Sequence, residues 1–184
     1  GGHAHILLTH THWGHIQGLP FFQPMLDEGW RFTILGPNAD GSLEELLLRQ
    51  MDQAYCPVPN FFDDRVGARV TIDDLDERAF DVGATRVTAR FVNHVAGTSC
   101  LGYRLDNGRS SMAYVPDVEY VEDGHRQPVL ELADGVDLLI HDAHVTAAEY
   151  HEFRGCGHSS DAAAVDLARD SGAARVLLFH HHPD

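Results

Sequence analysis

Five short apolar runs in this chain each lead directly to a histidine or an aspartate. The residues that follow these runs are His10, His94, Asp117, the pair His141 and Asp142, and His180. Such runs are typical of buried strands, and α/β sheets place their sites at the C-terminal ends of strands. A single ending of this kind has the ordinary interpretation of a capping or turn residue. Five in one chain predict a shared site along one edge of a sheet.

The densest of these endings is the segment His10-Thr11-His12-Trp13-Gly14-His15. Histidine makes up 14 of the 184 residues, and neutral imidazole is the commonest metal ligand. Two imidazoles in an H-x-H pair can lie on one side of a tight loop, with His15 facing the same cavity. Metal binding needs such nitrogens to converge to about 2.0–2.1 Å from one ion. The competing interpretation is a fortuitous histidine-rich loop.

The run His180-His181-His182 resembles an affinity tag in composition, but it directly follows a predicted strand. We therefore expect His180 to point inward. The roles of the other two histidines stay open at this stage.

The charge balance excludes several classes of function. The 28 acidic residues outnumber the 13 basic ones and give a net charge of −15. This balance argues against a protein that holds long nucleic acid on a basic face, and against an anionic membrane surface. No apolar run approaches the ~18 residues of a membrane span. The three cysteines are odd in number and widely spaced, which favours a reducing compartment, so we expect a cytoplasmic protein.

The arrangement of apolar runs predicts one α/β layered domain over residues 1–184. Asn107-Gly108 is a strong hairpin signal. Ser42 opens a capping box for a helix to about Gln53, and Ser159 or Ser160 caps a helix that ends at Asp170. The predicted strands are Ala4–Thr9, Arg31–Leu35, Thr85–Val92, Cys100–Leu105, Ser111–Val115, Val136–Ile140 and Val176–Phe179.

Two further segments have simple structural interpretations. Trp13, Phe21 and Phe22 favour core packing over stacking on the ring of a substrate. The acidic run Asp73–Glu77 predicts a solvated loop.

Taken in order, the histidine and aspartate motifs resemble those of the metallo-β-lactamase superfamily. That family has H-x-H-x-D-H after a strand, then a lone His, an Asp and a terminal His. Here these are His10, His12 and His15, then His94, Asp117 and His180, with the order kept from residue 5 to 181. The segments Leu138–Ala143 and Gly157–Ser160 are similar to motifs of the branch that contains ribonuclease Z and the cyclic-phosphate phosphodiesterases.

This resemblance implies a four-layer αββα sandwich with two metal ions at one edge of its sheets. The family fold has strands before the first histidine motif, so we expect this chain to lack its N-terminal strands. The resemblance also implies roles for eight residues. His10, His12 and His94 would hold the first metal, Asp117 would bridge, and His15 and His180 would hold the second. His158 would stabilise charge or donate a proton beside a phosphate, and Asp142 would orient it. For Asp142 a capping role, and for His158 a surface position, remain open alternatives.

The chain departs from the family motif at Gly14, where the family has an aspartate that ligates the second metal. Loss of that carboxylate predicts a weakened second site. Three interpretations follow: an engineered variant with weakened metal binding, a natural enzyme with one metal or a water-completed site, and a domain that binds without cutting. We favour the first, because the other motif residues are intact.

The sequence thus predicts a metal-dependent hydrolase, most simply a phosphodiesterase in which a metal-activated hydroxide attacks a small cyclic nucleotide or cyclic phosphate. The cofactor expected is zinc at two sites, with manganese or iron as alternatives because an aspartate is among the ligands. The expected partner is a small phosphodiester, without long nucleic acid or membrane, and a homodimer is left open. The alternatives are a lactone or thioester hydrolase of the same fold and a non-catalytic module that binds metal or nucleotide.

Overall fold

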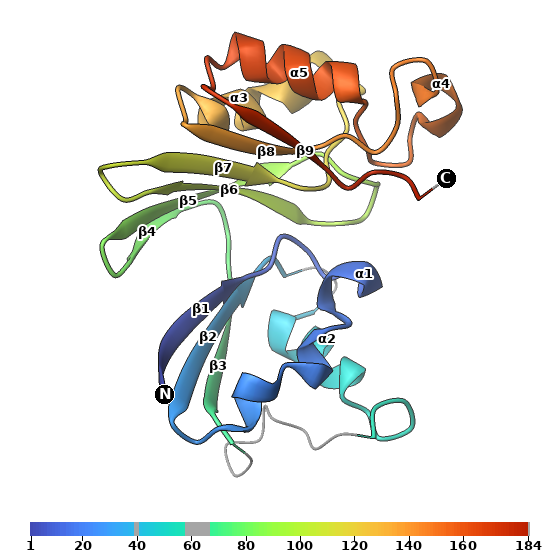
Figure 1. Ribbon diagram of the computed structural model, residues 1–184. Coiled ribbons are helices and arrows are strands. Elements are labelled where there is room, and N and C mark those ends of the chain that lie inside the picture. The colour runs from blue at the N-terminus through green and yellow to red at the C-terminus, as the bar shows by residue number, and fades with distance from the viewer. Residues whose placement is uncertain (39–40, 58–66, 184) are drawn as a thin grey trace. The chain divides into compact units, whose positions relative to one another are not determined.

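The structure is a computed structural model that describes residues 1–38, 41–57 and 67–183. The chain divides into two compact units, which are described separately: the N-terminal unit, residues 1–75, and the C-terminal unit, residues 76–184 (Figure 1). Within the described ranges, no helix is long and apolar enough to cross a membrane.

The N-terminal unit is built on a parallel sheet. In its described part the strand order is β1-β2-β3, with β1 at Gly2–Leu7, β2 at Trp30–Gly36 and β3 at Arg69–Asp74. Short helical turns follow β1, namely α1 (Trp13–Ile16) and the 3-10 turns η1 (Leu19–Phe21) and η2 (Gln23–Leu26). The segment from β1 to β2 therefore carries the histidine-rich motif out of the first strand.

Helix α2 (Leu43–Gln50) packs on this sheet through one apolar face. Leu43 and Leu47 are fully buried and lie one helical turn apart. The predicted cap is confirmed, because Ser42 Oγ accepts the Glu45 N–H at 3.2 Å. The helix ends at Gln50, three residues before the predicted end.

The C-terminal unit holds a mixed sheet in the order β4-β5-β6-β7-β8-β9. Strands β5, β6 and β7 pair antiparallel, whereas β7, β8 and β9 pair parallel. Because β5 and β7 both run opposite to β6, strands β5, β7, β8 and β9 all point the same way. Their C-terminal ends therefore meet at one edge of the sheet. The strands are β4 (Ala79–Val82), β5 (Thr85–Val92), β6 (Cys100–Asp106), β7 (Ser111–Val115), β8 (Leu138–Asp142) and β9 (Val176–Phe179).

Helices α3 (Gln127–Ala133), which follows the 3-10 turn η3 (Asp123–Arg126), and α5 (Asp161–Asp170) cover this sheet. Leu132 of α3 and Leu167 of α5 join Val115 and Leu139 of the strands in one buried cluster (Figure 1). Burial of each such side chain stabilises the fold by about 1.5–3 kcal/mol. Ser160 caps α5 by accepting the Ala163 N–H, as predicted. A short helix α4 (Tyr150–Phe153) lies between β8 and α5.

All seven predicted strands are present: Thr85–Val92, Ser111–Val115 and Val176–Phe179 have the predicted bounds, and the other four have shifted bounds. The predicted strand Val136–Ile140 is observed two residues later, so His141 and Asp142 are the last residues of β8 and do not follow it. The acidic run is not simply a solvated loop: Asp73 and Asp74 end β3, and Asp74 Oδ1 accepts the Leu43 N–H at 2.7 Å. Predicted core packing is wrong for Trp13, Phe21 and Phe22, because these side chains are 61%, 66% and 39% exposed.

Candidate metal centre

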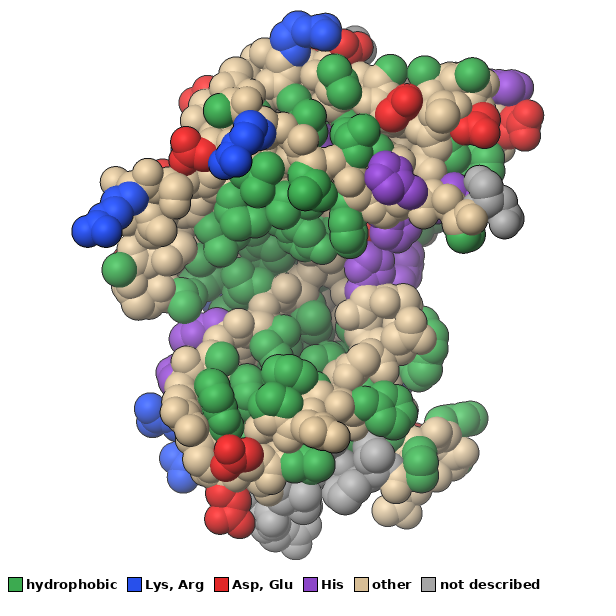
Figure 2. All heavy atoms as spheres, in the orientation of Figure 1, with side chains coloured by type: hydrophobic (Ala, Val, Ile, Leu, Met, Phe, Trp, Pro, Cys, Tyr) green, Lys and Arg blue, Asp and Glu red, His purple; other side chains and the backbone are tan. Residues whose placement is uncertain are grey.

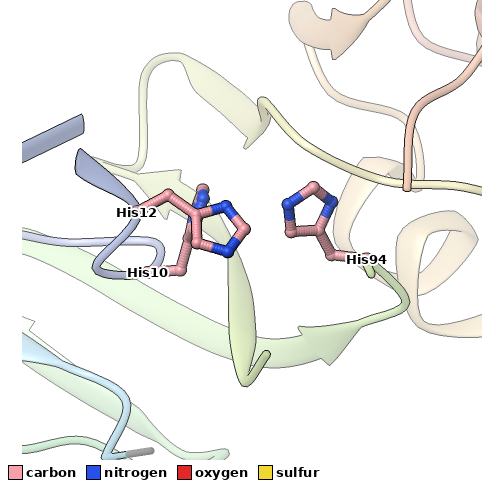
Figure 3. A group of neighbouring side chains, drawn as sticks. All are labelled: His10, His12 and His94. Carbon is pink, nitrogen blue, oxygen red and sulfur yellow. The ribbon is translucent and has the colours of Figure 1, made fainter. Parts of the chain in front are cut away.

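In the N-terminal unit, the predicted ligands of the first motif gather around His10. The ring centroids of His10 and His12 lie 4.5 Å apart, and those of His10 and His15 lie 4.3 Å apart. The His15 N–H donates to the His12 carbonyl at 2.9 Å, which opens α1 at this point. Figure 3 shows His10 and His12 on the loop that follows β1, and His94 on the segment that follows β5. The tight loop thus places three imidazoles of the motif side by side.

In the C-terminal unit, the remaining predicted residues lie at the edge where four strands end. His94 follows β5, Asp117 follows β7, Asp142 ends β8, and His180 follows β9. The parallel direction of these strands brings side chains together that are up to 86 positions apart in the chain, the separation of His94 and His180 (180 − 94). The prediction of one shared edge is therefore confirmed for four of the five strand endings. It is wrong for His10, because β1 belongs to the other sheet.

Asp117 lies between two of the predicted histidine ligands. Its Oδ2 atom is 3.7 Å from Nε2 of His94 and 3.9 Å from Nε2 of His180. Both distances exceed a hydrogen bond, but two donors that share one ion at about 2.0–2.2 Å stand about 3–4 Å apart. Asp117 is also almost fully buried, where a carboxylate needs a compensating cation. The donor set therefore fits divalent metal, with Asp117 between His94 and His180.

His94 is oriented by a backbone carbonyl. Its Nδ1 donates to the Gly157 oxygen at 2.7 Å, which leaves the lone pair on Nε2, the nitrogen on the side of Asp117, for a metal ion. Metal-binding histidines generally hold their second ring nitrogen in this way. Gly157 has φ +85°, and a Cβ at this position would lie 2.5 Å from His94 Nδ1. Glycine is thus required here for both its conformation and its small size.

The partly buried His158 forms an ion pair with the buried Asp142 at this edge. His158 Nδ1 donates to Asp142 Oδ2 at 2.8 Å, and the same carboxylate oxygen accepts the Val118 N–H at 3.1 Å. Burial lowers the pKa of His158, but the hydrogen bond and charge of Asp142, with Asp117 and Glu119 farther away, outweigh it and raise the pKa overall. The pair therefore favours the protonated form of the His158 imidazole, which lies close to His94 and Asp117.

Glu119 holds the loop that carries His158, a role that the sequence analysis did not predict. Its carboxylate is buried and accepts the N–H groups of Gly155 at 2.7 Å and Gly157 at 2.8 Å, together with the Tyr150 hydroxyl at 2.8 Å. Burial and the bond to Glu119 raise the pKa of Tyr150 to about 12. These contacts join residues more than 30 positions apart, so no local motif could have revealed them.

His144 is a second residue that sequence reasoning missed. It lies in the loop after β8, and its ring stacks on that of His158 with centroids 4.4 Å apart. The neighbouring His180 has φ 62°, the single positive φ among the non-glycine residues that the structure describes. Such strained backbone is concentrated at functional sites.

Gly14 lies within α1 with open space around it. Among the described residues, no atom apart from those of its chain neighbours and its own helix backbone lies within 4 Å of a Cβ placed at this position. The backbone thus accommodates the aspartate that the family motif has at this position.

These features agree with the comparisons to known proteins. The profile of the β-lactamase superfamily domain matches residues 2–181. The chain belongs to this superfamily. It is 25% identical to ribonuclease BN of Cronobacter sakazakii over 95% of this chain and 69% of that protein.

Solved structures show the same metallo-β-lactamase fold. Human tRNase Z, short form, matches 97% of this chain and 72% of its own with a TM-score of 0.73 and 22% identity. A diphosphatase from the PhnP family matches 97% of this chain and 60% of its own with a TM-score of 0.70 and 21% identity. The predicted α/β metallo-β-lactamase fold is therefore confirmed.

Proposed function

We propose that this superfamily member is a metal-dependent phosphodiesterase that acts on a small cyclic nucleotide or cyclic phosphate. His94, Asp117 and His180 would hold zinc from the C-terminal unit, and His10, His12 and His15 would contribute from the N-terminal unit, as the family motif implies. When bound, the ions would generate a nucleophile from water and stabilise negative charge. The proposed ligand set of each ion is the one that the sequence motif predicts.

The observation that carries this proposal is the His158–Asp142 pair at 2.8 Å beside Asp117. Donor atoms of His94, Asp117 and His158 lie within 4.8 Å of one another. A phosphodiester carries a negative charge, and hydrolysis also needs a proton at the leaving oxygen. His158, with its raised pKa, would meet both needs through Nε2, while Asp142 fixes Nδ1. A lactone, which is neutral, makes less use of such a cation.

The charge of the chain supports a small substrate. The net charge is −15, and on the face drawn in Figure 2 the arginine side chains form small separate areas, several of them with acidic side chains nearby. Long nucleic acids are held by continuous rows of cationic side chains. A compact phosphate, in contrast, would bind mainly through the metal charge, with His158 beside it, because divalent ions dominate the local field.

Hydrolysis assays on three substrates test the proposal. The purified protein, loaded with zinc, is assayed with a cyclic nucleotide, with bis(p-nitrophenyl) phosphate and with a lactone. We expect weak turnover of the two phosphodiesters and a rise in that rate for Gly14→Asp, which restores the motif carboxylate. Gly18→Asp is the matched control, since it adds the same charge at another open glycine of this segment.

Other results would overturn the proposal. Turnover of the lactone alone would assign the site to carbonyl chemistry. Binding of metal or nucleotide without turnover, even in Gly14→Asp, would assign a non-catalytic module. Equal gains in Gly14→Asp and Gly18→Asp would show that added charge, not the motif carboxylate, changes the rate.

A further inference from the structure

Three histidines of the C-terminal unit converge from three separate loops. His144 follows β8, His158 precedes α5, and His180 follows β9. The loops are tied by backbone bonds: the His144 N–H donates to the Ser159 carbonyl at 2.9 Å, and the His182 N–H donates to the His144 carbonyl at 2.7 Å. Backbone hydrogen bonds between the loops therefore help to fix the positions of these histidines, in addition to side-chain packing.

The spacing of the three rings matches that of imidazoles on one ion. Ring centroids lie 4.4 Å apart for His144 and His158, 4.8 Å for His158 and His180, and 5.2 Å for His144 and His180. Imidazoles whose nitrogens lie about 2.0–2.1 Å from a shared ion have centroids about 4.4–5.1 Å apart. One ligand nitrogen from each ring lies within 4.8 Å of the others. The rings lie at 12–31° to one another, so binding of one ion by all three requires the side chains to rotate.

Two of the three rings already have their second nitrogen occupied, as metal-binding histidines do. His158 Nδ1 donates to the Asp142 carboxylate at 2.8 Å. His144 Nδ1 donates to the His180 backbone carbonyl at 2.9 Å, because a carbonyl oxygen can only accept. Both rings therefore have Nε2 as the atom that can offer an electron pair to a metal.

We propose that His144, His158 and His180 form a binding site for a divalent transition-metal ion, with zinc as the best-suited ion for three imidazoles. The site lies wholly within residues 76–184, so its ligands include none from the His10–His15 motif. It shares His158 and His180 with the proposed hydrolytic centre. Metal bound by all three would withdraw His158 from the phosphate and would inhibit hydrolysis when zinc is in excess. Only this inhibitory consequence rests on the proposed function; the binding site does not.

The test is metal titration of the full-length, metal-stripped protein with Zn²⁺ by calorimetry and with Co²⁺ by visible absorption. We expect one equivalent of metal to bind at the site of His144, His158 and His180. The His12→Gln variant should still bind this equivalent, and His144→Gln should bind it at least about tenfold more weakly than the parent. His158→Gln, on a different loop, should give the same loss, which guards against a folding defect in one variant. His151→Gln is the matched control, since this exposed histidine of α4 lies close in sequence but outside the cluster.

The inhibitory role has its own readout. Hydrolysis of bis(p-nitrophenyl) phosphate by the parent protein should rise and then fall as zinc is added, and the fall should disappear in His144→Gln. If His144→Gln and His158→Gln bound the metal as tightly as the parent does, the proposed binding site would be overturned. Loss of the same equivalent in His12→Gln would also overturn it. Absence of any hydrolysis would overturn the proposed function and leave the binding result to stand by itself.

Discussion

The backbone carbonyl of Gly157 accepts a hydrogen bond from Nδ1 of His94 at 2.7 Å. One residue therefore connects two parts of the candidate centre, since Gly157 directly precedes His158 and also orients the ring of His94. The positive φ of Gly157 directs its carbonyl toward His94, and the missing side chain leaves room for the ring. The geometry of His94 thus depends on a glycine 63 positions away.

Substitution Gly157→Ala should lower both stability and metal affinity. Its methyl group would meet His94 Nδ1 at 2.5 Å and the Val95 nitrogen at 2.7 Å. Gly155→Ala is the matched control, because it has a similar positive φ with no atom of the described residues within 4 Å. We expect Gly157→Ala to cost about 1–3 kcal/mol more in urea unfolding than the control. Equal losses in the two variants would mean that conformation alone, and not contact with His94, requires this glycine.

Glu119→Gln should loosen the loop that carries His158. The amide offers one acceptor oxygen in place of two, so either the partly buried N–H of Gly155 or the buried N–H of Gly157 loses its partner. An unsatisfied buried donor costs about 1–3 kcal/mol, which urea unfolding would detect. Glu122→Gln is the control, since that carboxylate is largely exposed. Equal stability of Glu119→Gln and the parent would contradict the anchoring role.

The local signals of the sequence predicted much of this fold. The caps of α2 and α5 depend on Ser42 and Ser160 and on residues within three positions, so they are visible in the sequence. The strand endings were equally informative, because the direction of a strand determines where its last side chains lie. Asp117, Asp142 and His180 consequently lie at one edge, as predicted.

Other features depend on contacts that no short segment encodes. Strand β3 has only Val70 and Ile72 as apolar members, and its register comes from its pairing with β2. In the sequence, Glu119 has no feature that distinguishes it from a solvent-exposed acidic residue. Its role depends on the hydrogen bonds from Gly155 and Gly157, which the fold brings close to it. His144 lacks a motif of its own and becomes significant only because β8 and β9 are neighbours.

Asp142→Asn should lower the pKa of His158 in the metal-free protein. The substitution removes the charge that raises this pKa, while the burial that lowers it remains. NMR titration of the His158 ring would measure the change, with the exposed Asp170→Asn as control. Because folding raises this pKa, the pair stabilises the protein fully below the ordinary imidazole value, and this contribution is lost as pH rises through the folded value. The stability difference between parent and Asp142→Asn should therefore shrink as the pH rises through that value. An unchanged His158 pKa in Asp142→Asn would contradict the assigned ion pair.

Cys156 should be the one cysteine that reacts rapidly with a thiol reagent in the folded protein. It is exposed, whereas Cys56 and Cys100 are buried. Burial raises the pKa of Cys100, and the charges of Asp117 and Asp142 add to this, so Cys100 stays in the thiol form that reacts poorly. Ellman's reagent should thus modify one equivalent quickly under native conditions and three in guanidinium. Cys156→Ser should remove the fast equivalent, and a fast reaction that persists in this variant would show that a buried cysteine is reached by local opening.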